Sequence, residues 1–158
     1  MSIELGLIIF IPLCILGGRR YGTLLAVKYL LIQRVAGLLI LGGLVLSVFD
    51  RLAGFMGPGL SLMLLLKLGG FPFFHWLILI GEKLGWLPLY LILTLQKLIP
   101  LFILSHTPSV LIYGLSILSW VAIPAMGVLC KTLKKIVILS SLFNLMLIAG
   151  TLEVSSSK

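Results

Sequence analysis

The chain consists almost entirely of apolar runs that are too long and too uniform for a protein surrounded by water. Of its 158 residues, 61% are hydrophobic and only 10% are charged, whereas soluble domains carry about 25% charged residues. So few polar side chains cannot cover a water-facing surface. The composition therefore excludes an ordinary soluble enzyme and a disordered tail, and it predicts an all-α polytopic membrane protein.

Glycine, proline and charged residues divide this apolar sequence into segments of membrane-spanning length. A helix needs about 20 residues to cross the hydrocarbon core of a bilayer. We therefore predict a single transmembrane domain of about six transmembrane helices, over residues 2–17, 23–49, 59–80, 87–105, 108–130 and 134–151.

Two of these segments carry a signal for an interrupted helix. In 59–80, regular helix is expected to stop at the Gly-Gly pair at 69–70, because Pro72 follows closely. The rest of that segment then either completes the crossing or lies at the membrane interface. Further along, Pro100 cannot donate a backbone hydrogen bond to the preceding turn, which predicts a broken helix near Pro100.

Basic residues are distributed unequally between the two sides of this arrangement. Alternating spans put six of them on one side and two on the other, so the positive-inside rule makes the first side equivalent to the cytoplasm. The net charge of +8 is spread over short gaps and not along one face, which excludes a nucleic-acid-binding domain. The six are Arg19, Arg20, Lys83, Lys131, Lys134 and Lys135, and the two are Arg51 and Lys158.

Three ionisable residues are expected deep in the bilayer. At a rise of about 1.5 Å per residue, Lys67 and Lys97 lie roughly 13 and 16 Å inside their spans, near the midplane. Glu4 lies about 22 Å from the basic side, past the middle. A central charge costs roughly 2.5–3.5 kcal/mol on insertion scales, so each of the three is a candidate functional residue. An acid and two bases at comparable depth are typical of a proton relay.

Three other polar residues are accessory candidates with competing explanations. Arg34, about 18 Å deep, is either functional or paired with a carboxylate of a neighbouring subunit. Lys28 is only about 9 Å deep and is able to snorkel to the basic side. His75 lies beside Trp76, where an interfacial role is favoured.

The sequence predicts no cofactor or metal in this chain. It contains no GxGxxG, GxxxxGK[ST], HExxH or CxxC pattern. Cys14 and Cys130 are interpreted as small apolar fillers, and a single pair of histidines, His75 and His106, does not favour haem ligation within the bundle.

Five short stretches resemble NADH dehydrogenase subunit 2 of respiratory complex I, and they occur in that family's order. Two of them are 66–73 (LKLGGFPF), followed by Trp76, and 95–100 (LQKLIP). The others are 26–33, residues 3–5 with 10–12, and 133–136 with the serines at 140–141.

The resemblance implies an antiporter-like membrane subunit of the enzyme NADH:ubiquinone reductase (H+-translocating), with no redox centre of its own. By position, Glu4 matches the family's acidic partner, Lys67 the lysine paired with it, and Lys97 the next lysine inward. NAD, FMN, iron-sulfur clusters and ubiquinone would reside in partner subunits. The implied location is the mitochondrial inner membrane, or a bacterial inner membrane, with the basic loops on the matrix side and the gene carried by the organelle.

The chain also departs from the family pattern. About six spans make only part of the family's two five-helix inverted repeats, so we expect a partial antiporter-like bundle, a shortened form. The remaining helices would be lost, encoded as a separate fragment, or replaced by another membrane-arm subunit. Two alternatives stay open: a structural or assembly subunit of the same membrane arm with a broken relay, and an unrelated small multi-span transporter.

Overall fold

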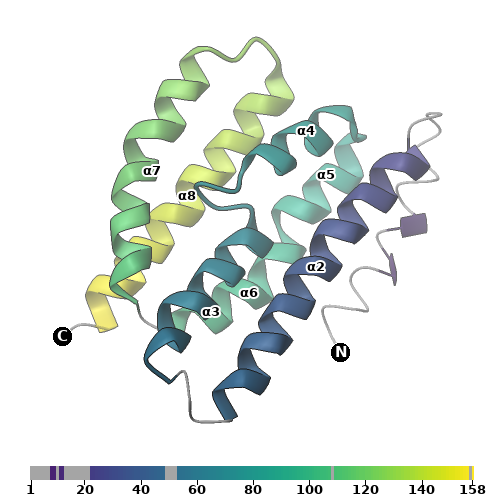
Figure 1. Ribbon diagram of the computed structural model, residues 1–158. Coiled ribbons are helices and arrows are strands. Elements are labelled where there is room, and N and C mark those ends of the chain that lie inside the picture. Colours follow the sequence, from purple (N-terminus) through teal and green to yellow (C-terminus); the bar gives the residue numbers. More distant parts are fainter. Residues whose placement is uncertain (1–7, 10, 13–21, 49–52, 108, 157) are drawn as a thin grey trace.

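The computed structural model describes residues 8, 9, 11, 12, 22–48, 53–107, 109–156 and 158. All the longer elements among them are α-helices, which confirms the predicted all-α class (Figure 1). Most of the predicted segment 2–17, including Glu4, and the basic residues Arg19, Arg20 and Arg51 fall outside this part of the chain. The elements are α2 (Gly22–Val48), α3 (Ala53–Leu68), α4 (His75–Lys83), α5 (Trp86–Leu93), α6 (Leu95–Ser105), α7 (Val110–Val128) and α8 (Leu133–Ser156).

Four stretches of the described chain are long and apolar enough to cross a membrane. They are Thr23–Leu46, Trp86–Ser105, Val110–Val128 and Leu133–Ser156, and a shorter apolar helix covers Pro58–Leu68. Large apolar side chains remain exposed along their outer faces, for example Leu38, Val121 and Val128. Such faces suit a protein whose surroundings are lipid, because an exposed apolar side chain costs little there.

α3 ends at Leu68, at the glycine pair where the sequence predicts a stop. The Gly69 N–H donates to the Leu66 carbonyl at 3.2 Å, and the Gly70 N–H donates to the Leu65 carbonyl at 2.9 Å. Gly69 has φ +69°, so this is the left-handed helix end that glycine adopts most readily. The chain then turns through Phe74 and begins α4 at His75, so the predicted segment 59–80 contains two helices.

The predicted break near Pro100 lies six residues earlier, at Thr94. The Thr94 N–H and Oγ1 both donate to the Tyr90 carbonyl, at 3.0 and 2.8 Å, and the backbone there has ψ −80°. Back-bonding by a threonine hydroxyl bends helices, so the bend separates α5 from α6. Pro100 itself lies inside α6 and is buried.

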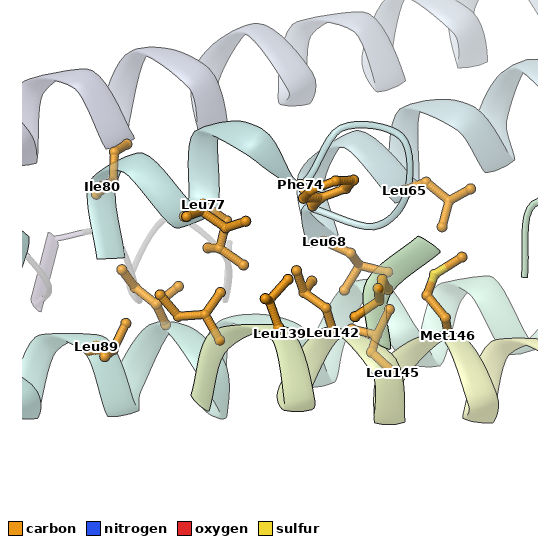
Figure 2. Packing of buried hydrophobic residues seen from close by; sticks show 14 of the residues in the cluster. Leu65, Leu68, Phe74, Leu77, Ile80, Leu89, Leu139, Leu142, Leu145 and Met146 are labelled. Carbon is orange, nitrogen blue, oxygen red and sulfur yellow. The ribbon is translucent and has the colours of Figure 1, made fainter. Parts of the chain in front are cut away.

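The helices pack around a core in which α3, α4, α5 and α8 meet. α8 contacts α7, α4 and α6, while α3 contacts α2, α6 and α7. Figure 1 shows the α7–α8 pair along one side of the bundle and α2 along the opposite side. The buried side chains between them are shown in Figure 2 and include Leu65, Leu68, Phe74, Leu77, Ile80, Leu89, Leu139, Leu142, Leu145 and Met146.

Two lysines at the start of α8 hold the α4–α5 connection. Lys134 Nζ donates to the Leu84 carbonyl at 2.6 Å and lies 5.6 Å from the centre of the Trp86 ring. Lys135 pairs with Glu82 at 3.3 Å. These contacts bring the α4–α5 connection and the α7–α8 connection, with their lysines, to the same end of the bundle.

Candidate functional site

Lys97 is the most deeply buried charged residue in the described part of the chain. It lies in the first turn of α6, directly after the bend at Thr94, and its side chain is 8% exposed. It occupies the middle of the membrane-length stretch Trp86–Ser105. The bend therefore places an ammonium group inside the bundle at a depth where lipid offers no solvation.

The partner of Lys97 comes from α8. Lys97 Nζ donates to Ser141 Oγ at 3.0 Å. A protonated lysine has three donors, whereas a serine hydroxyl both donates and accepts. Ser141 is therefore able to accept from an ammonium and, after rotation of its hydroxyl, to donate to a neutral amine.

A hollow of about 480 Å³ lies beside this pair, between the α5–α6 stretch and α8. Its polar lining consists of Thr94, Lys97, Ser140, Ser141 and Asn144, and its remaining lining is apolar. The volume is large enough for several water molecules. A lysine with a hydroxyl partner and room for water is able to hold and release a proton.

Lys67 lies at a second helix interruption. It is half-buried in the last turn of α3, two residues before Gly69, and its carbonyl accepts a hydrogen bond of 3.3 Å from Gln33 Nε2 on α2. Gln33 is itself only 5% exposed. Because α3 packs against α6, the two lysine-bearing helices are neighbours, and both lysines adjoin a break in regular helix. Such breaks free backbone groups to bind water or ions.

The other predicted residues lie away from this hollow. Lys28 and Arg34 on α2 and His75 at the start of α4 are exposed. His75 lines a separate hollow of about 540 Å³, whose other lining residues are apolar or aromatic, including Trp76. Glu4 lies outside the described residues.

The structure adds Ser141 and Asn144, which were not among the predicted site residues. A signal for them exists in the sequence, because Ser140, Ser141 and Asn144 interrupt the apolar run of α8 at one-turn spacing. Only the packing of α8 against α6 shows that this polar strip faces Lys97. Within the described residues, no group of three or more His, Cys, Asp or Glu side chains comes together as a metal site.

Three curated relatives share a name. The chain is 33% identical over 116 residues to NADH-ubiquinone oxidoreductase chain 2 of Artemia franciscana, which covers 72% of this chain and 36% of the relative. The protein of the same name from Artemia salina is 36% identical over 98 residues, 62% of this chain and 63% of the relative. The protein of this name from Lumbricus terrestris is 31% identical over 106 residues, which cover 66% of this chain and 32% of the relative.

The matches thus span between about a third and two thirds of each relative's own length. The chain matches no family model. The relatives confirm the resemblance that the sequence motifs indicate.

Proposed function

We propose that this chain, which resembles the NADH dehydrogenase subunit 2 family, is a membrane subunit of proton-translocating NADH:ubiquinone oxidoreductase. In this proposal Lys97 and Lys67 carry protons through the membrane arm together with Glu4. The observation that carries it is the burial of Lys97 at the middle of a membrane-length stretch, with its ammonium on Ser141. A buried charge at this depth is costly to retain, which favours a functional reason for it.

The geometry supports a relay at Lys97 in two ways. Ser141 serves as a partner in both protonation states of the amine, so proton loss does not leave a buried polar group without a hydrogen bond. The adjoining hollow gives water a route to the amine between Thr94 and Asn144. Lys28, Arg34 and His75 are exposed, which fits accessory roles.

The location follows from the same proposal. NAD, FMN, iron-sulfur clusters and ubiquinone belong to partner subunits, and the chain works among the other membrane-arm subunits in the mitochondrial inner membrane. The lysines of the α4–α5 and α7–α8 connections share one end of the bundle through the contacts of Lys134 and Lys135. The positive-inside rule places that end on the matrix side.

The test is the proton yield of the intact complex. We expect Lys97→Met and Lys67→Met to lower the number of protons moved per NADH oxidised, because methionine keeps the volume and removes the titrating amine. Lys83→Met, at an exposed position in the last turn of α4, is the matched control and should leave the yield unchanged.

Unchanged proton yield in both variants would overturn the relay. If deletion of the chain then prevented assembly of the membrane arm, the role would be structural. Ion flux through the purified chain alone in liposomes would instead identify an independent transporter.

A further inference from the structure

An apolar groove between α7 and α8 runs from the basic end of the bundle toward its middle. It has a volume of about 380 Å³. Its floor includes the buried Ile123 and Leu139, 2% and 3% exposed. The rest of its lining is Pro124, Gly127, Val128, Ile136, Ser140 and Phe143. It is separate from the hollow beside Lys97, with which it shares only Ser140.

Gly127 keeps the groove open. A Cβ atom at Gly127 would meet nothing within 4 Å, so the space beside this position is not filled by the protein's own side chains. The same α7 surface is apolar above and below it, since Val128 is 86% exposed and Pro124 also lines the groove. The groove is therefore shaped for a slender apolar group.

A basic residue follows the α7 lining of the groove, three residues after Val128. Lys131 is exposed in the short connection between α7, which ends at Val128, and α8, which begins at Leu133. Figure 1 shows this connection at one end of the α7–α8 pair. This end of the bundle carries four lysines, Lys83, Lys131, Lys134 and Lys135, against the single described carboxylate of Glu82. Lys134 and Lys135 already contact Leu84 and Glu82 at the end of α4, whereas Lys131 is exposed at the surface.

We propose that this groove binds one anionic phospholipid, with its phosphate at Lys131 and an acyl chain along α7 and α8. The order of features matches such a lipid: a cation comes first at headgroup depth, and an apolar channel follows toward the middle of the bilayer. Basic residues beside membrane helices attract anionic headgroups by roughly 1 kcal/mol each. A neighbouring protein helix would need an apolar face at the groove and an acidic residue at the depth of Lys131.

The full chain, reconstituted in phosphatidylcholine nanodiscs, provides the test. One sample contains a small fraction of phosphatidylglycerol with a photoactivatable group in its acyl chain, and the other contains phosphatidylcholine with the same acyl chain. We expect the anionic probe to label residues 123–128 and 136–143 about fivefold more than the zwitterionic probe, the preference that one lysine gives.

Two pairs of variants separate the headgroup from the chain. Lys131→Gln should reduce anionic labelling to the zwitterionic level, while Lys158→Gln, the same charge change at the other end of the chain, should not. Gly127→Leu should reduce labelling by both probes several-fold because it fills the groove. Gly114→Leu, on the same helix and also with nothing within 4 Å of its Cβ position, should not.

Helical circular dichroism confirms that each variant is folded before labelling. Equal labelling by the two probes, or labelling that Lys131→Gln or Gly127→Leu leaves unchanged, would overturn the proposal. The same labelling in the assembled membrane arm tests a protein occupant. If neither probe labelled the groove there and a partner peptide were cross-linked to it instead, the groove would be assigned to a protein helix.

Discussion

At the scale of single residues, the contact between Lys97 and Ser141 joins two helices through a charged hydrogen bond. The hydrogen bond of 3.0 Å connects α6 to α8 beside the apolar side chains of Leu93, Leu101 and Leu145. Ser140, its neighbour, donates to the Val137 carbonyl of its own helix at 2.9 Å. Of these two adjacent serines, Ser141 accepts a hydrogen bond from another helix and Ser140 donates one within its own helix.

A double-mutant cycle measures this contact independently of function. In detergent-solubilised chain, we expect Ser141→Ala to lower the free energy of unfolding, and to do so less in a Lys97→Met background. The coupling should be about 0.6–1.7 kcal/mol, the range for hydrogen bonds between membrane helices. Ser140→Ala is the control and should show no coupling to Lys97. An equal cost of Ser141→Ala in both backgrounds would contradict the contact.

At the scale of elements, the α3–α4 junction depends on one backbone conformation. Gly69 adopts φ +69°, and a Cβ there would lie 3.3 Å from both Leu77 Cδ2 and Trp76 Cζ2. The junction redirects the chain immediately after Lys67. It also lets Phe74 and Leu77 enter the core beside Leu68 (Figure 2).

Substitution by alanine should change the stability of the chain in opposite directions at a glycine inside α3 and at the glycine that follows α3. Gly69→Ala should destabilise the chain by about 1–2 kcal/mol, the cost of the left-handed conformation for a residue with a Cβ. Gly59→Ala, inside α3 with nothing within 4 Å, should stabilise it by about 0.5–1 kcal/mol because alanine favours helix. Chemical unfolding in detergent measures both. Equal effects of the two substitutions would contradict the described junction.

At the scale of the whole molecule, close approach of α7 and α8 sets the position of α8 against the rest of the bundle. Small residues are buried on both helices, Ser116 and Ser119 on α7 and Ala149 and Gly150 on α8, and Gly150 lies against Ser116 and Trp120 of α7. Small side chains allow membrane helices to approach closely and gain dispersion contacts. α8 then presents its other faces to α4 and α6.

A larger residue at Gly150 should separate this pair. A Cβ at Gly150 would lie 2.9 Å from Ser116 Oγ and 3.1 Å from the Trp120 ring, neither of which is able to yield easily. We expect Gly150→Leu to cost about 1–3 kcal/mol, as overpacking does elsewhere. Gly114→Leu, which meets open space on α7, is the control in the same thermal unfolding assay. A Gly150→Leu variant as stable as the control would argue against the α7–α8 packing.

Much of the fold follows from local sequence. Apolar run length and the distribution of glycine and proline determine an all-helical membrane chain and the end of α3 before Gly69. The position of the bend before Lys97 does not follow from them. Pro100 indicated a break in the right stretch, but the hydroxyl of Thr94 placed it six residues earlier. Proline is tolerated inside α6. At Thr94, in contrast, the side-chain hydroxyl donates a hydrogen bond to a carbonyl of the preceding turn, and such a bond bends the helix.

For the site, the sequence alone determined that Lys97 is a charge within a membrane-length apolar stretch, because depth depends only on the number of residues from the ends of that stretch. It equally determined that Lys67 precedes a helix stop. Only the tertiary structure decided that Lys97 meets Ser141, that Asn144 lines the same hollow, and that Gly127 lines a groove between α7 and α8. The physical reason is that every apolar helix face is equally acceptable to lipid, so side-chain packing between helices chooses which faces meet.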